Sequence, residues 1–170
     1  MKLYKNLVLV GMMGSGKSLI GKILSRKLDF DFIDTDRKIE DIEKKTISEI
    51  FKSNGEKYFR NIEEVISLKS LKLNNSVIAL GGGGYINPAI RKYVIQKCIS
   101  FWLNWKNETL VNRIKFSKKR PVAMKLSDLE LNRLINKRST IYNLSDYKIN
   151  CDKLDKNQIV EKIINFYEKS

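Results

Sequence analysis

Short apolar runs alternate along this chain with longer stretches in which apolar residues recur at helical spacing. The short runs predict strands over residues 6–10, 30–33, 76–80, 98–103 and 147–151. The helical spacing predicts helices over residues 18–28, 37–44, 56–73, 108–115, 127–144 and 157–168, with a further helix that starts at Asn87-Pro88. Because strands and helices alternate, we expect an α/β fold, a three-layer sandwich with a five-stranded parallel sheet flanked by helices.

A polar segment separates the second and third long helical stretches. Thr46 or Ser48 can cap a short helix that runs through Phe51, and Asn54-Gly55 can close it. The sequence therefore predicts a break in helical structure just before residue 56.

The length of 170 residues is enough for one core, and no linker or internal repeat divides the chain. No apolar run approaches the roughly 20 residues that cross a bilayer. Residues 1–13 superficially resemble a signal peptide, but the apolar part is short and runs directly into Gly14-Ser15-Gly16-Lys17. We expect a single domain, residues 1–170, in the cytoplasm and without membrane contact.

The composition excludes one class of metal site and raises one alternative function. Two cysteines, Cys98 and Cys151, and no histidine leave no basis for a zinc site, and both cysteines lie in apolar segments typical of a reduced core. The net charge of +14 suggests nucleic-acid binding, but 25 lysines and 8 arginines are scattered along the whole chain. We favour an anionic small-molecule ligand and expect no nucleic-acid partner.

Residues 11–18 fit the G-x-x-x-x-G-K-[ST] phosphate-loop pattern between a predicted strand and a predicted helix. The glycines let backbone N–H groups surround phosphates, and the helix N-terminus adds a positive dipole end. Lys17 can reach the β- and γ-phosphates, and Ser18 can coordinate Mg²⁺. The alternative is a turn without a ligand. We expect an NTPase-type fold that binds ATP or GTP, together with Mg²⁺, through a set of adjacent residues: Gly14, Ser15, Gly16, Lys17, Ser18 and Leu19.

Two carboxylates follow the second predicted strand. Residues two apart on a strand point the same way, so Asp34 and Asp36 can both face the crevice where open α/β sheets bind ligands. Mg²⁺ or a hydroxyl-rich substrate between them would relieve their repulsion. The alternative is that one of them only caps the next helix.

Three arginines and a glycine run are further candidates. Arg60 has Glu63 three residues later, which can hold its guanidinium or form an ordinary surface ion pair. The run 81–84 of four glycines ends a buried strand, where it can expose backbone N–H groups to a ligand or form a flexible turn. Arg120-Pro121 lies in a charged stretch typical of a nucleotide-closing lid, or of a solvated loop. Arg138, late on the following helix, carries no signal alone.

In this order and spacing these features resemble the shikimate kinase family over nearly the whole chain. The resemblance rests on the phosphate loop, Asp-Thr-Asp at 34–36, Phe-Arg-x-x-Glu at 59–63, Leu-Gly-Gly-Gly at 80–83, Arg-Pro at 120–121 and Lys-Arg at 137–138. The phosphate loop alone is generic, whereas the combination is specific.

The resemblance implies a nucleotide core, a substrate-binding segment near residues 34–62 and a lid near residues 114–126. It implies transfer of the γ-phosphoryl of ATP to the 3-hydroxyl of shikimate, with Lys17, Asp36 and Arg120 as catalytic residues. The other implied roles follow the family motifs. On the shikimate side, Asp36 binds the hydroxyls, Arg60 and Arg138 clamp the carboxylate, and the Gly82 backbone supports the substrate. On the nucleotide side, Asp34 acts with Ser18 at Mg²⁺, Arg120 reaches the phosphates and Arg113 lies near adenine. We expect a monomer.

The chain departs from the family pattern at Gly84, at Val122-Ala123 after the Arg-Pro pair, and at Lys153 near the expected adenine edge. The nearest rival function is a kinase for another small hydroxylated metabolite such as gluconate. A rival from another class is a basic nucleic-acid-binding module that uses ATP as a switch, and it would need clustered basic and aromatic residues.

Overall fold

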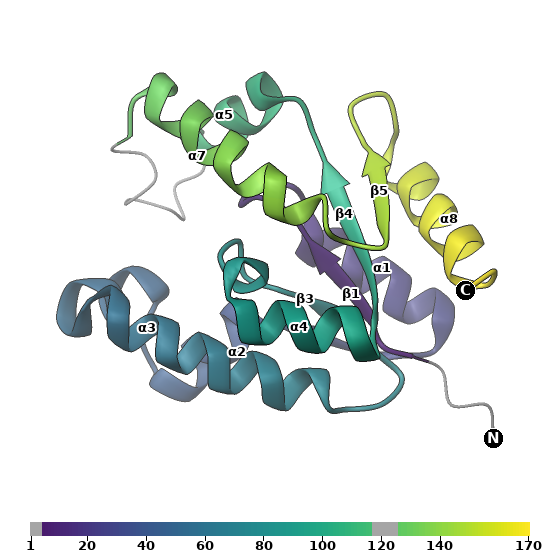
Figure 1. The fold of residues 1–170 in the computed structure, drawn as a ribbon, viewed down its shortest axis with the longest axis horizontal. Helices are drawn as coiled ribbons and strands as arrows, with labels where there is room; N and C mark the ends of the chain where they lie inside the picture. The colour runs from purple at the N-terminus through teal and green to yellow at the C-terminus, as the bar shows by residue number, and fades with distance from the viewer. Residues whose placement is uncertain (1–4, 117–125) are drawn as a thin grey trace.

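The computed structural model of the chain describes residues 5–116 and 126–170. At its centre is a sheet of five strands: β1 (Leu7–Val10), β2 (Asp31–Asp34), β3 (Ser76–Ala79), β4 (Ile99–Asn104) and β5 (Tyr147–Asn150). All neighbouring strands are parallel, in the order β2-β3-β1-β4-β5 (Figure 1). Each strand lies within one residue of its predicted bounds, and the predicted α/β fold is confirmed.

Helices connect the strands, as the sequence predicts. In chain order they are α1 (Lys17–Leu28), α2 (Thr35–Glu43), α3 (Ile47–Leu71), the short 3-10 helix η1 (Gly84–Ile86), α4 (Pro88–Lys97), α5 (Asn107–Lys115), α7 (Asp128–Tyr142) and α8 (Lys156–Tyr167). Within the described residues none of these helices is both long and apolar enough to cross a membrane.

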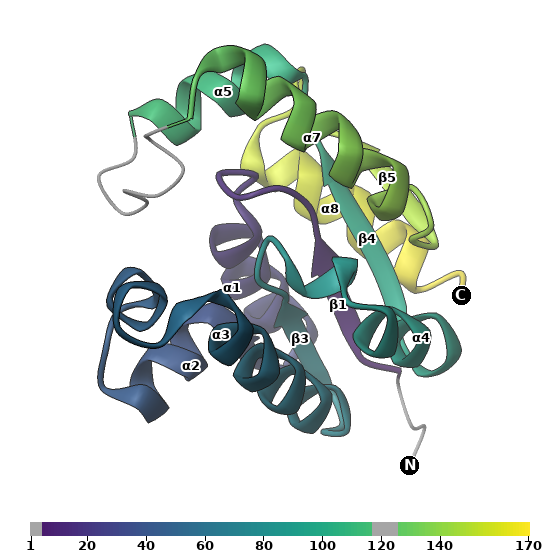
Figure 2. The ribbon, with the colours of Figure 1, turned by 60° about the vertical axis from the view of Figure 1, so that its left-hand side comes forward.

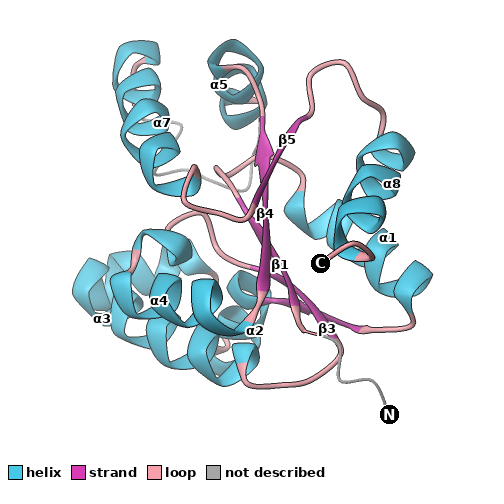
Figure 3. Ribbon diagram, turned by 45° about the vertical axis from the view of Figure 1, so that its right-hand side comes forward, coloured by secondary structure: helices cyan, strands magenta, loops and turns pink. Residues whose placement is uncertain are grey.

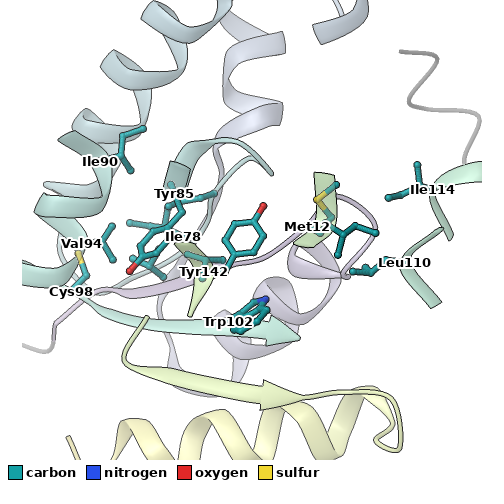
Figure 4. Packing of buried hydrophobic residues seen from close by; sticks show 14 of the residues in the cluster. Met12, Ile78, Tyr85, Ile90, Val94, Cys98, Trp102, Leu110, Ile114 and Tyr142 are labelled. Atoms are coloured by element: carbon teal, nitrogen blue, oxygen red, sulfur yellow. The ribbon is translucent and has the colours of Figure 1, made fainter. Parts of the chain in front are cut away.

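The helices lie on both sides of the sheet (Figure 3). Successive strand residues point to opposite faces, so Leu7 and Leu9 pack with α1 and α8, whereas Val8 and Val10 pack with α4, α5 and α7. Figure 4 shows the second of these cores, in which Tyr142 and Trp102 lie between the sheet and the helices. The two cores fix the sheet and therefore the loops at the carboxyl ends of its strands.

The helices α2 and α3 form a smaller unit with its own core of Ile39, Ile50, Phe59 and Ile66. Thr46 caps α3 with a capping box, and the helix is interrupted at Gly55, where φ is +83°. The predicted break before residue 56 is therefore present, as a kink at Gly55 where two helical segments of α3 meet. In Figure 2 this unit lies on one side of the loops that follow β1 and β3, with α5 and α7 on the other.

The two cysteines are buried and free of disulfides. Cys98 is the C-cap residue of α4, directly before β4, and Cys151 directly follows β5. Burial raises the pKa of each thiol to about 12. Both are therefore reduced core residues, as expected.

Candidate active site

The phosphate loop joins β1 to α1 and has the backbone shape that its glycines predict. Gly14 and Gly16 have φ of +79° and +89°, and Gly16 is the N-cap of α1. A residue with a Cβ is strained in this conformation, so the glycines are needed for the turn itself. Leu19 lies in the first turn of α1 with its side chain 55 % exposed, so only its backbone belongs to the loop.

Lys17 is buried beneath the loop and points back into it. Its Nζ donates to the carbonyl oxygens of Gly11 and Met12 at 2.8 and 2.9 Å, and lies 3.4 Å from the Ser15 hydroxyl. An ammonium group has three donors and binds anionic oxygens more strongly than neutral carbonyls. The arrangement places a fixed positive charge where the loop would receive phosphates.

Ser18 and Asp34 meet directly across the loop. The Ser18 hydroxyl donates to Asp34 Oδ2 at 2.5 Å, and Asp34 Oδ1 accepts from the backbone N–H of Arg37 at 3.3 Å. Asp34 therefore caps α2, as the alternative interpretation predicts, and is also a neighbour of the phosphate loop. A hydroxyl beside a carboxylate is a donor set that Mg²⁺ accepts, usually with waters and phosphate oxygens.

The expectation that Asp36 shares a strand face with Asp34 is wrong. Asp34 ends β2 and caps α2, so Asp36 lies in the first helical turn, where residues two apart do not face each other. Asp36 nevertheless faces the crevice from the helix: a Cβ built on Gly81 would lie 2.3 Å from its Oδ1. The carboxylate therefore lies against the glycine run that follows β3.

Arg60 is held over the same glycine run by two glutamates. Its Nη1 donates to Glu63 Oε2 at 2.7 Å, and its Nε and Nη2 donate to Glu56 Oε1 at 3.2 and 3.1 Å. Phe51 and Phe59 lie beside it, with ring centroids 5.9 and 5.2 Å from Cζ. A guanidinium has five N–H donors, so two remain for a ligand.

Glu63 is an unusually buried carboxyl, with only 2 % of its side chain exposed. Burial raises its pKa, and the charges and hydrogen bonds of Arg60, together with the charge of Arg138, act against this rise. Burial alone would lower the pKa of Arg60, but Glu63 and Glu56 raise it above its usual value. Arg60 is consequently charged, and its guanidinium is held in place by the buried Glu63 carboxylate.

Arg138 reaches the glycine run from α7. Its Nη1 lies 3.4 Å from the Gly82 carbonyl oxygen and 3.7 Å from Met12 Sδ. The Tyr142 hydroxyl donates to the same carbonyl at 2.5 Å. Arg60 and Arg138 are far apart in sequence, yet both lie against residues 82 and 83, since a Cβ on Gly83 would be 2.3 Å from Arg60 Nη1.

The glycines of the run differ in how closely they are approached. A Cβ on Gly82 would lie 3.2 Å from Met13 N of the phosphate loop, so the run and the loop are neighbours. A Cβ on Gly84 would meet nothing closer than 3.5 Å. A side chain would therefore fit at Gly84, the fourth glycine, at which the chain departs from the family pattern.

The expected nucleotide residues outside the loop lie on or near α5. Arg113 Nη1 is 3.5 Å from the Gly14 carbonyl oxygen, and its Cζ is 3.8 Å from the centroid of the Trp105 ring. Lys153 lies in the turn between β5 and α8, where the adenine edge is expected. Arg120 lies outside the described residues, as does most of the predicted lid.

Several contacts in the site have no signal in the sequence that would identify them. Glu56, a second partner of Arg60 at i−4, is an exception, because both residues follow the kink at Gly55 and helical spacing could have revealed the pair. Tyr142 and Trp105 reach the site through contacts 60 and 90 residues away in the chain. Periodicity cannot reveal such pairs.

Comparison with known proteins gives consistent matches. The family model for shikimate kinase matches residues 13–168. Shikimate kinases from Caldicellulosiruptor bescii and Caldanaerobacter subterraneus are 39 % and 34 % identical, and the matches cover 96 % and 97 % of this chain and 95 % and 97 % of theirs. The structure of Acinetobacter baumannii shikimate kinase in complex with shikimate superimposes with a TM-score of 0.91 at 28 % identity, covering 98 % of this chain and 94 % of that one.

Proposed function

The chain belongs to the shikimate kinase family of ATP-dependent phosphotransferases, and we propose that the residues described above transfer the γ-phosphoryl of ATP to the 3-hydroxyl of shikimate. The products are shikimate 3-phosphate and ADP, in the biosynthesis of chorismate and aromatic amino acids. The observation that carries the assignment is the meeting of Arg60 and Arg138 on one glycine run beside the phosphate loop.

On the nucleotide side, the backbone N–H groups of residues 14–19 and the N-terminus of α1 bind the phosphates. Lys17 exchanges its carbonyl acceptors for phosphate oxygens, because full negative charges attract an ammonium more strongly. Its charge is then in place when negative charge shifts toward the bridging oxygen.

Ser18 and Asp34 would hold Mg²⁺, and their oxygens fit this hard cation. When bound, Mg²⁺ neutralises phosphate charge. Within the described residues, no cluster of three or more Cys, Asp or Glu side chains could hold an ion without further ligands. The remaining ligands would thus be waters and phosphate oxygens, as Mg²⁺ commonly has.

On the acceptor side, Arg60 and Arg138 bind the shikimate carboxylate, for which a guanidinium is suited by its planar fork of donors. Asp36 accepts hydrogen bonds from the shikimate hydroxyls and orients the attacking oxygen, and the Gly82 backbone supports the ring. Gly81 and Gly83 allow Asp36 and Arg60 to lie directly against the glycine run, since a Cβ at either position would collide with them. Positioning and charge neutralisation supply most of the rate in such transfers.

The remaining roles are carried by the family pattern. Arg120 is assigned to the transferring phosphate, within a lid near residues 114–126, and Arg113 to adenine. The substrate-binding segment near residues 34–62 corresponds to α2 and α3 up to Arg60. We propose a cytoplasmic monomer, and sedimentation of the purified protein at assay concentration tests the oligomeric state.

A coupled assay of ADP release tests the function. With ATP and Mg²⁺, we expect turnover with shikimate and, at the same concentration, at least about a hundredfold less with gluconate, because loss of matched polar contacts is strongly discriminated. Equal or faster turnover with gluconate or a nucleoside would overturn the assignment of shikimate while leaving the kinase class intact.

A further inference from the structure

Trp105, directly after β4, contacts two parts of the nucleotide side of the site. Its indole Nε1 donates to the Ser15 carbonyl oxygen at 2.9 Å, and its ring lies under the guanidinium of Arg113, 3.8 Å from Cζ to the ring centroid. We propose that Trp105 is a positioning residue for the purine base of the phosphate donor: it holds Arg113 at a fixed height over the phosphate loop so that the base stacks on its open face. This inference rests on the proposed function, which supplies ATP as the donor.

Trp105 is itself a rigid support. Its side chain is half-buried and packs against both principal cores, one on each face of the sheet. The next residue is held from another loop, since the backbone N–H of Lys106 donates to Asp152 at 2.9 Å and the Thr109 hydroxyl donates to the same carboxylate at 2.9 Å. Asp152 thereby fixes the start of α5, the helix that carries Arg113.

Arg113 needs such a support because it lies exposed on α5 and has a long side chain with much rotamer freedom. Its hydrogen bond to the loop, at 3.5 Å from Nη1 to the Gly14 carbonyl oxygen, is at the limit of a hydrogen bond. The stacked indole is therefore its stronger contact. A guanidinium stacks on aromatic faces, so a planar base can stack on the face that Trp105 does not cover.

Trp105 also couples the base to the phosphates. The Ser15 carbonyl that it holds belongs to the loop that wraps the phosphates, and the apolar side of α5 packs against the same loop: Figure 4 shows Leu110 and Ile114 beside Met12. A donor that has both a base and a phosphate chain must therefore match the fixed distance between Arg113 and the phosphate loop. A donor without a base would gain nothing from Trp105.

The test compares Trp105→Leu and Trp105→Phe with Trp102→Phe. Trp102 is the other tryptophan of the chain; it lies three residues earlier in β4, 5 % exposed, with Lys148 over its ring and no hydrogen bond to the loop among those of the described residues. We expect Trp105→Leu to raise the KM for ATP by roughly three- to tenfold, as the loss of a partly desolvated cation–π contact would. Trp105→Phe keeps an aromatic ring, so its KM for ATP should lie between those of wild type and Trp105→Leu. In both variants kcat and the KM for shikimate should change far less.

Inorganic tripolyphosphate, which has no base, separates this role from a general effect on the loop. Its inhibition constant should be the same in wild type and Trp105→Leu. In an Arg113→Ala background, Trp105→Leu should have no further effect on the KM for ATP, because the two residues act as one unit. Thermal unfolding of each variant identifies any loss of fold, and Trp102→Phe reports the effect of loosening β4.

Three results would overturn the proposal. One is a loss of tripolyphosphate binding in step with ATP, which would mean that Trp105 acts on the loop through Ser15. Another is an equal effect of Trp105→Leu with and without Arg113. The last is a KM for ATP that does not rise: an unchanged value would mean that Trp105 has no role in binding the base, and a lower value that the indole occupies the place of the base. If the chain fails to phosphorylate shikimate, calorimetric titration with ATP and tripolyphosphate still decides among these outcomes.

Discussion

Neighbouring glycines after β3 offer a matched pair for testing the acceptor site. Gly83 has φ −99° and ψ −14°, which an alanine adopts without strain, and Gly84 is not among the positive-φ glycines. Any difference between Gly83→Ala and Gly84→Ala therefore comes from what the new methyl group meets. At 83 it would lie 2.3 Å from Arg60 Nη1 and 3.0 Å from Cζ, whereas at 84 nothing is closer than 3.5 Å.

The methyl group at 83 must displace the guanidinium by about 1 Å to restore normal contact. Such a shift takes Nη1 out of hydrogen-bond range of Glu63, now 2.7 Å away, and moves the donors meant for the carboxylate. A charge-assisted hydrogen bond is worth about 1.5–3 kcal/mol, so the KM for shikimate should rise by roughly ten- to a hundredfold. The displaced atoms end a flexible side chain, so the fold should lose only about 1 kcal/mol.

Steady-state kinetics with each substrate varied in turn, together with thermal unfolding, decides the matter. Gly84→Ala should match wild type in all constants, and Gly83→Ala should keep its KM for ATP within about twofold. The reasoning is refuted if Gly83→Ala binds shikimate normally, or if both alanine variants lose affinity equally.

Further predictions concern other parts of the site and the core. Lys17→Ala should lower kcat by more than about a hundredfold while the protein still unfolds cooperatively, since one preorganised charge is lost; near-normal turnover would contradict its role. Asp36→Asn should weaken shikimate binding in calorimetry and leave ATP binding nearly unchanged, and a parallel loss of both would place Asp36 at the metal instead. Cys98 and Cys151 have pKa values raised to about 12 by burial, so at pH 8 only about one thiol in ten thousand is ionised. A disulfide reagent should therefore label them only after unfolding in guanidinium, and rapid labelling of the native protein would refute this.

Local patterns were sufficient to predict the sheet and the phosphate loop and to suggest Asp34, Asp36 and Arg60 as candidates. The family resemblance was needed to assign roles to the other candidates: Gly82, Arg113, Arg120 and Arg138. The apolar runs match the bounds of the central strands β1, β3 and β4 because these strands are buried on both faces. The edge strands β2 and β5 are partly exposed and contain polar residues, so their apolar signal is shorter. Arg60 and Glu63 are one helical turn apart, so their ion pair follows from spacing alone.

The other features of the site could not be predicted, because they depend on whether a strand or a helix cap forms at one position and on contacts between residues far apart in the chain. Alternation alone predicts Asp36 on a strand, because it cannot show that the Asp34 carboxylate caps α2 and that the helix begins at Thr35. The support of Gly82 by Tyr142 and of Arg113 by Trp105 joins elements that only the folded sheet brings together. Such contacts are set by tertiary packing, which no period in the sequence records.

The account depends most on the claim that Arg60 and Arg138 select an acceptor that bears a carboxylate. The direct measurement is the ratio of kcat/KM for shikimate to that for an analogue without the carboxylate, in wild type, Arg60→Ala and Arg138→Ala. Wild type should prefer shikimate by at least about a hundredfold, and each alanine variant should lose roughly tenfold or more of that preference. If both variants kept the full preference of wild type, the carboxylate would be bound elsewhere and the account would be contradicted.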